Sequence, residues 1–132
     1  MLAAVLGAAT SVGDVEEAGA SPGLFCRAES SISRSAPEVG AIYGQAGAFC
    51  HQPERSEAWV TAKLFRANML ISTRSNHCVP GRFNDGDYCT TPLLSASNPD
   101  GDQSFRLIVT VRYIPGPGAR AVTTEAISTG TF

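Results

Sequence analysis

The chain has 132 residues, which is enough for one domain with a single modest hydrophobic core. Its net charge is −2, and its 10 Lys and Arg residues are scattered rather than gathered into a cluster that could neutralise a run of phosphates. We therefore expect neither nucleic acid nor an anionic membrane as a partner. The composition, 43 % hydrophobic and 17 % charged with 13 Gly and 8 Pro, indicates a globular, turn-rich chain and favours an all-β fold.

The first residues form a short apolar run. Residues 1–10 are too few to cross a bilayer, so we expect no membrane span. Residues 18–20, Ala-Gly-Ala, have the small-x-small pattern of a signal-peptidase site, although the basic n-region is missing. We interpret residues 1–23 as a signal-peptide remnant or a flexible leader, and residues 24–132 as the folded domain. The alternative is an Ala/Gly-rich leader of a cytosolic protein.

The N-terminal part of the domain predicts two strands. Residues 25–28 are expected to form the first strand, followed by a polar loop over residues 29–38. Residues 39–50 have glycines at positions 40, 44 and 47 among apolar side chains, a spacing that suits a bulged or edge strand.

The clearest local pattern is a β-hairpin over residues 59–74. Two β-rich runs flank Ala67 and Asn68, and Asn tolerates the left-handed backbone that a tight turn needs. A helix over residues 56–71 is the alternative, but the β-branched residues favour strands. We expect a loop over residues 76–89, which are rich in Pro, Gly, Asn and Asp.

The C-terminal part predicts further strands. Residues 90–95 continue an extended path, and residues 98–101, Asn-Pro-Asp-Gly, form a turn. Residues 105–113 alternate apolar and polar side chains with the period of two of a half-buried strand, and residues 121–131 supply a closing strand. About six to eight short strands predict a small antiparallel β-sandwich of immunoglobulin-like architecture.

Four cysteines, Cys26, Cys50, Cys78 and Cys89, are distributed along this domain. An even number of cysteines in a small chain indicates two disulfides and an oxidising compartment, so we expect a secreted, extracellular protein. Four cysteines allow three pairings. The order along the chain favours Cys26 with Cys50 and Cys78 with Cys89, because each pair closes a short loop rich in turn residues.

Metal binding is the competing interpretation of the same residues. Adjacent Cys-His pairs at positions 50–51 and 77–78 offer zinc ligands, but neighbouring side chains of a strand point to opposite faces and no Cys-x-x-Cys pair is present. The acidic segments 85–87 and 98–102 are explained by turn formation, since Val109 stands where a calcium loop needs Glu. We expect no metal and no cofactor.

No catalytic motif is evident. The chain has no Gly-x-Ser-x-Gly elbow, no Gly-rich phosphate loop and no recognisable carboxylate pair, so we expect a protein that is not an enzyme. The alternative is a hydrolase whose site combines His51 and His77 with Asp85 and Asp87. Otherwise both histidines are expected at the surface.

The candidate binding residues lie between the last two cysteines: Phe83, Asp85, Asp87 and Tyr88. Aromatic residues with a polar group are frequent at binding hot spots, and a loop closed by a disulfide loses less entropy on binding. Trp59, in contrast, begins a predicted strand, and we expect it in the core.

The C-terminal half carries a series of motifs: Ala-Trp-Val-Thr-Ala-Lys-Leu-Phe-Arg, then Asn-His-Cys, a further cysteine, and Asn-Pro-Asp-Gly before the last long strand. Because of these motifs, residues 59–132 resemble a loose group of small exported proteins from actinobacteria. The resemblance implies a β-sandwich with disulfides and an extracellular location, and it implies no particular activity. Ala67 and Asn68 depart from it, because such proteins often carry Asp-Gly at the turn.

Together these features predict a secreted, non-enzymatic binding or adaptor domain that acts through contacts with an extracellular protein partner. A small inhibitor of an extracellular enzyme, the hydrolase described above, and a structural component of the cell envelope are the alternatives.

Overall fold

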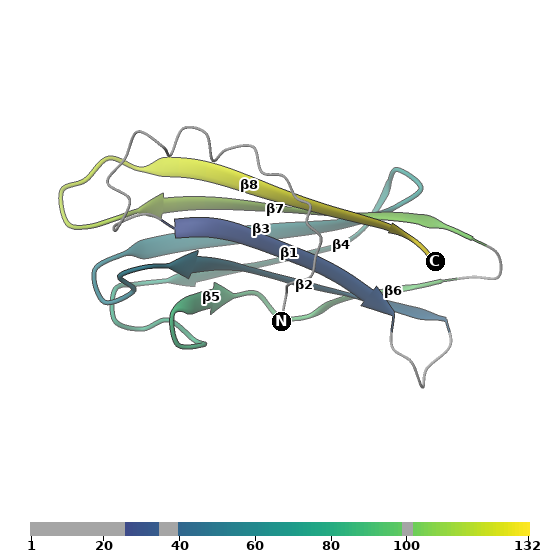
Figure 1. Ribbon diagram of the computed structural model, residues 1–132, viewed down its shortest axis with the longest axis horizontal. Coiled ribbons are helices and arrows are strands. Elements are labelled where there is room, and N and C mark those ends of the chain that lie inside the picture. The colour runs from purple at the N-terminus through teal and green to yellow at the C-terminus, as the bar shows by residue number, and fades with distance from the viewer. Residues whose placement is uncertain (1–25, 35–39, 99–101) are drawn as a thin grey trace.

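The computed structural model describes residues 26–34, 40–98 and 102–132, and its regular structure in these ranges consists of β-strands (Figure 1). The strands are β1 (Cys26–Arg34), β2 (Ala41–Cys50), β3 (Glu57–Arg66), β4 (Met69–Cys78), β5 (Tyr88–Thr90), β6 (Leu94–Ser97), β7 (Ser104–Ile114) and β8 (Val122–Thr131). The leader expected over residues 1–23 lies outside the described residues.

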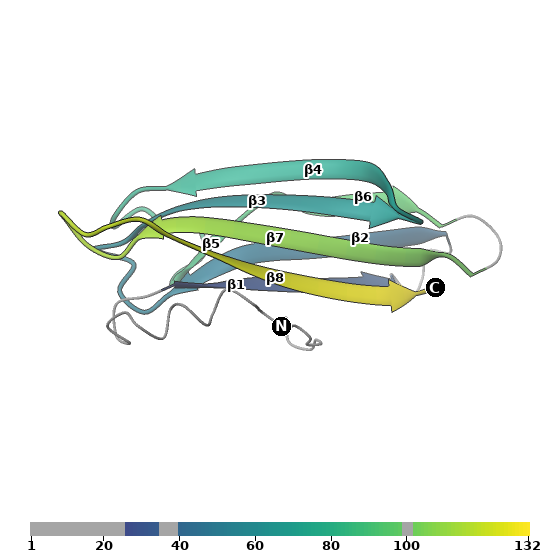
Figure 2. The ribbon, with the colours of Figure 1, turned by 90° about the horizontal axis from the view of Figure 1, so that it is seen from above.

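The strands form two antiparallel sheets that pack face to face. Sheet A has the order β1-β2-β5, and β6 pairs with the opposite end of β2. Sheet B has the order β4-β3-β7-β8, and its strands lie side by side in Figure 2, in front of β1 and β2. Two facing antiparallel sheets, with the chain crossing between them after β2, β4 and β6, form a sandwich of the immunoglobulin-like architecture. The predicted fold class is confirmed.

The hydrophobic core lies between the sheets, and β7 contributes its largest side chains. Every second residue of β7 is buried, as the alternation of residues 105–113 predicts. These residues are Phe105, Leu107, Val109, Val111 and Tyr113. The inward-facing residues of the neighbouring strand β3 are Ala58, Val60, Ala62 and Leu64, all fully buried.

β2 is a central strand whose register with β1 is unbroken, so the bulged or edge strand expected for residues 39–50 is wrong. It pairs with β1 on one side and with β5 and β6 on the other. Gly47 fits this position because β5 approaches it closely. A Cβ atom at Gly47 would lie 3.0 Å from Thr90 Cγ2 and 3.1 Å from the Cys89 carbonyl oxygen. This glycine therefore marks a close approach between strands and not a free edge.

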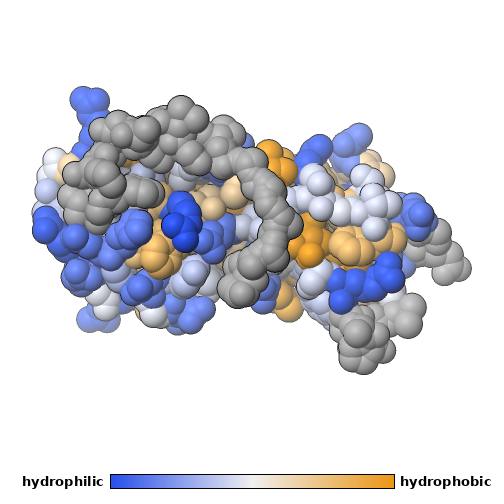
Figure 3. Space-filling view, viewed as in Figure 1, coloured by the Kyte–Doolittle hydropathy of each residue, from blue (hydrophilic) through white to orange (hydrophobic). Residues whose placement is uncertain are grey.

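β1 extends to Arg34, into the segment expected to be a polar loop. One of its polar side chains, that of Ser30, is accommodated by hydrogen bonds to β7 and β8 of the facing sheet. The hydroxyl of Ser30 donates to the Leu107 carbonyl at 3.2 Å and lies 2.6 Å from the hydroxyl of Ser128. These contacts close the edge of the sandwich formed by β1 and β8. Figure 3 shows this edge, where apolar residues appear in patches among hydrophilic ones.

The β-hairpin predicted around Ala67 and Asn68 is confirmed, and β3 pairs with β4 over nearly the full length of both strands. Both turn residues have a positive φ, 47° at Ala67 and 68° at Asn68, which is the pattern of a two-residue type I′ turn. The register shifts once, between Leu64 and Phe65.

The loop expected over residues 76–89 is shorter in the structure, because β4 continues to Cys78 and β5 begins at Tyr88. The extended path expected over residues 90–95 is divided between β5 and β6. Of the turn expected at residues 98–101, only Asn98 is described, and its N–H donates to the Gly40 carbonyl at 2.8 Å.

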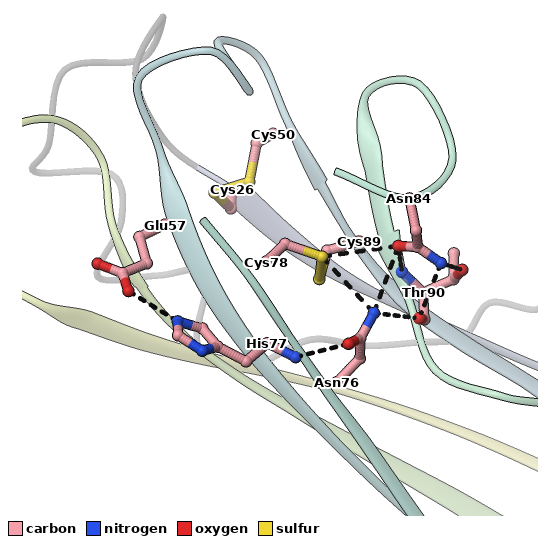
Figure 4. Close-up of a disulfide and its surroundings, with 9 residues drawn as sticks. All are labelled: Cys26, Cys50, Glu57, Asn76, His77, Cys78, Asn84, Cys89 and Thr90. Carbon is pink, nitrogen blue, oxygen red and sulfur yellow. Dashed lines mark hydrogen bonds and ion pairs between the residues drawn. A yellow bond between two sulfur atoms is a disulfide. The ribbon is translucent and has the colours of Figure 1, made fainter. Parts of the chain in front are cut away.

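Both predicted disulfides are present (Figure 4). Cys26 and Cys50 are directly paired residues of β1 and β2, with Cα atoms 4.1 Å apart. Cys78 and Cys89 join β4 of sheet B to β5 of sheet A, with Cα atoms 5.9 Å apart. The second disulfide is thus a covalent link between the two sheets. Because the four sulfurs are paired in two disulfides, no thiolate remains for the zinc site considered above.

Candidate binding surface

The segment between β4 and β5, residues 79–87, is held in place from several sides. The Cys78–Cys89 disulfide joins its two ends. Asp85 and Tyr88 exchange N–H···O bonds of 3.1 and 2.9 Å across a tight turn, and the positive φ of Gly86, 63°, fits its first central position. The N–H of Cys50 donates to the Asp87 carbonyl at 3.1 Å, which ties the turn to β2.

Two asparagine side chains, one from this segment and one from β4, bond to Thr90 of β5 (Figure 4). Asn84 accepts the Thr90 backbone N–H at 3.0 Å and donates to the Thr90 hydroxyl at 2.8 Å. Asn76 of β4 donates to the Thr90 carbonyl at 2.8 Å, so sheet B is bonded to sheet A beside the disulfide. Thr90 therefore has its backbone groups held by side chains where β5 has no further strand beside it.

An aromatic row crosses the outer surface of sheet A next to this segment. Arg27, Phe49 and Tyr88 are opposite one another on β1, β2 and β5. The Arg27 guanidinium lies over the Phe49 ring, 4.7 Å from its centroid. The Phe49 and Tyr88 rings are 5.2 Å apart and tilted by 59°. The rings are half-buried, and the row presents a cation, an apolar ring and a phenol to solvent.

Acidic groups surround Tyr88. Arg27 Nε forms an ion pair with Glu29 Oε2 at 3.0 Å, and the Glu29 side chain is 18 % exposed. Burial raises the pKa of the Tyr88 hydroxyl above its usual 10.0, and the charge of Glu29 raises that pKa further. Arg27 lowers it, whereas Asp85 and Asp87 raise it. Three carboxylates against one guanidinium give this surface an acidic character.

A hollow of about 120 Å³ lies beside the aromatic row. Its floor is Gly47, which is directly paired with Glu29 on one side and Thr90 on the other. Because Gly47 has no side chain, the methyl group of Thr90 can approach it closely on one side, while Glu29 flanks it on the other strand. The full lining comprises Glu29, Gln45, Ala46, Gly47, Asp85, Tyr88 and Thr90.

We call the outer surface formed by Arg27, Glu29, Phe49, Asp85 and Tyr88 the β5 face. Of the sequence-predicted binding residues, Tyr88 and Asp85 belong to it, and Asp87 is exposed on the adjoining turn. Phe83 does not belong to it, because its half-buried ring packs against the core.

Sequence reasoning missed Arg27, Glu29 and Phe49. A signal for Phe49 was available, because Cys50 must point inward to form its disulfide and the preceding residue of a strand then points outward. The same signal was available for Arg27, which follows Cys26 in the predicted strand, whereas Glu29 carried none because residues 29–38 were expected to be a loop.

Trp59 lies on the outer surface of sheet B, so its expected place in the core is wrong. It alternates with the buried Ala58 and Val60 and shares its face with the exposed Lys63. Arg112 covers one side of the indole, with its guanidinium carbon 4.6 Å from the ring centroid, and the parallel ring of His77 covers the other. Because these two side chains cover the Trp59 ring, the ring is half-buried although it faces outward.

The structure does not unite the residues of the hydrolase alternative. His77 lies on the outer surface of sheet B, where its Nε2 is 2.7 Å from Glu57 Oε2. His51 contacts Phe49 beside the β5 face of sheet A, with ring centroids 5.2 Å apart. Both histidines are exposed, as expected, but His77 lies on β4 of sheet B whereas His51 directly follows β2 of sheet A. Among the described residues, no three His, Cys, Asp or Glu side chains are grouped to hold a metal ion.

The fold and its crosslinks define a disulfide-bonded antiparallel β-sandwich, and two disulfides are compatible with an oxidising extracellular environment. No protein-family model, curated protein or solved structure matches the chain. Within the described ranges, no helix has the length and apolar character needed to cross a membrane.

Proposed function

We propose that this protein is a secreted, non-enzymatic binding domain that contacts an extracellular protein partner through its β5 face. The observation that carries the proposal is the outward row of Arg27, Phe49 and Tyr88, three residue types that are enriched at protein interfaces. They lie on three paired strands instead of on a free loop.

The rigidity of this surface supports recognition by a preformed site. Tyr88 is next to the disulfide residue Cys89, and the turn before it is bonded to both β2 and β5. A surface that is already ordered loses little conformational entropy when a partner binds. The acidic surroundings of Tyr88 favour a partner with a basic patch, because complementary charge accelerates encounter and fixes orientation.

Photo-crosslinking tests this proposal. A benzophenone amino acid at the exposed position Asp87, beside the β5 face, is compared with the same probe at the exposed Thr123 on the outer surface of sheet B. Both variants are incubated with culture medium of the source organism, and adducts are identified by mass spectrometry. We expect a discrete adduct from position 87 alone, competed by unlabelled protein and not by a Phe49→Ala, Tyr88→Ala variant.

Identical adducts from positions 87 and 123, or equal competition by the double variant, would contradict a role for the β5 face. If the captured protein is an enzyme, its activity in the presence of the domain distinguishes an inhibitor from an adaptor. Peptide mapping without reductant, on protein recovered from the medium, tests export and both disulfides together.

A further inference from the structure

We propose that the hollow above Gly47 binds the ammonium group of a lysine side chain on the partner. This inference rests on the proposed function, since it names the chemical group that the β5 face recognises. It starts from the pairing of Glu29, Gly47 and Thr90, which lie side by side on β1, β2 and β5. A hollow of about 120 Å³ is lined by all three of these residues.

The lining of the hollow includes two carboxylates, those of Glu29 and Asp85, and contains no Lys or Arg. Gln45 contributes a polar side chain, whereas the Thr90 hydroxyl is already bonded to Asn84 and its methyl group faces Gly47. An ammonium group has three donors and no acceptor, so this lining matches its bonding capacity. Tyr88 adds an aromatic ring, which attracts a cation placed over its face.

The chemistry of the hollow favours an ammonium group over other cations. A calcium ion takes six to eight oxygen ligands with several carboxylates, whereas only Glu29 and Asp85 line this hollow with carboxylates. A guanidinium binds best as a planar fork against a carboxylate or flat on a ring. Arg27 already lies over the Phe49 ring and donates to Glu29, so the chain's own guanidinium occupies one ring and one carboxylate of the β5 face. A compact ammonium group can enter between the side chains that remain.

Arg27 also sets the expected affinity. Its Nε is 3.0 Å from Glu29 Oε2, so it neutralises part of the charge that would hold the ligand. Removing this guanidinium leaves Glu29 free to accept bonds from the ammonium group and removes a repelling charge. An Arg27→Gln variant is therefore expected to bind more tightly than the natural chain, which is the opposite of what simple loss of a contact surface would produce.

The test uses ¹⁵N–¹H spectra of the intact, disulfide-bonded chain, titrated with the peptide acetyl-Gly-Lys-Gly-amide. Three control peptides replace lysine by Nε-acetyl-lysine, by arginine, or by glycine with a free N-terminal amine. We expect saturable shifts at the amides of Gly47 and Thr90 with the lysine peptide, and weaker or absent shifts with each control peptide.

Charge variants locate the contact. Glu29→Gln and Asp85→Asn are each expected to weaken binding about threefold, the effect of one partly exposed charge pair. Asp87→Asn removes the same charge from the same turn but lies outside the hollow, so its affinity should stay near that of the natural chain. A uniform loss in all three variants would overturn the site and indicate general electrostatic attraction.

Equal or larger shifts with the acetylated, arginine or lysine-free peptide would overturn the assignment of a lysine ammonium group. If no lysine binding occurs while the competed adduct at position 87 persists, the hollow is not the recognition site and the proposed function stands. Loss of both results overturns both.

Discussion

Trp59 and His77 stack face to face across the β3–β4 pair, with ring centroids 4.8 Å apart and planes inclined by only 6°. Arg112 lies on the opposite face of the indole, and Glu57 binds the imidazole Nε2 at 2.7 Å. Four side chains of three neighbouring strands thus form one continuous stack on the outer surface of sheet B. The stack shields an apolar ring that the strand places on the solvent side.

Replacing His77 by Ala should expose the indole, because one of its two covered faces becomes open to water. Trp59 is the only tryptophan of the chain, so its fluorescence reports this change directly. We expect a red shift of the emission maximum and a loss of about 0.5–1 kcal/mol in the free energy of unfolding. His51→Ala, at the exposed histidine of sheet A, is the control; equal spectra of the two variants would disprove the shielding.

Asn84→Ala should loosen the attachment of the segment before β5, since Asn84 bonds both the backbone N–H and the hydroxyl of Thr90. We expect a loss of about 1 kcal/mol in the free energy of unfolding, measured by urea denaturation. The amide of Thr90 should also exchange its hydrogen faster. Unchanged exchange at Thr90 would show that the disulfide at Cys89 holds β5 without help from Asn84.

Removing either disulfide by paired Cys→Ala substitution should cost about 3 kcal/mol, since the bridges close loops of similar entropy, with sequence separations of 24 and 11 residues. The two losses should differ in their local effect. Without the Cys78–Cys89 bridge, hydrogen exchange should rise across the β5 face, because that bridge links the sheets there. Equal exchange of the β5 face in both variants would contradict this assignment.

Ala67→Gly should stabilise the chain by roughly 0.5–1 kcal/mol, because Ala67 has a φ of 47° and its Cβ disfavours the left-handed backbone. Asn68→Gly is the matched control. Asn tolerates this conformation, so the same change there should gain less. Thermal unfolding of both variants makes the comparison, and a larger gain at position 68 would contradict the strain at Ala67.

Tyr88 should make the fold less stable in alkaline solution. Its folded-state pKa lies above the usual 10.0, chiefly through burial, so the unfolded chain loses the phenolic proton first as the pH rises. The free energy of unfolding should therefore fall once the pH exceeds about 10, until the folded-state pKa is passed. Tyr88→Phe should remove this part of the pH dependence. The difference in phenolate absorbance between the natural chain and this variant measures the titration, and a midpoint at or below 10.0 would contradict it.

Local sequence patterns predicted much of this fold. The alternation of residues 105–113 placed every second side chain, from Phe105 to Tyr113, on one buried face. The two β-rich runs on either side of Asn68 indicated a hairpin. The order of the cysteines favoured the pairing that the structure contains. The extent of β1 was not predictable in this way, because its polar residues are satisfied by distant partners such as Ser128.

The sequence by itself determined where most of the strands lie, where the tight turn falls and how many crosslinks can form, because period-two alternation and turn chemistry act between near neighbours. Only the tertiary structure decided which strands are central and which outward side chains meet across neighbouring strands. The pairing of β1, β2 and β5 brings Arg27, Phe49 and Tyr88 into one row, and the pairing of β3 with β4 and β7 turns Trp59 outward. Such relationships depend on register and sheet packing, which join residues far apart along the chain.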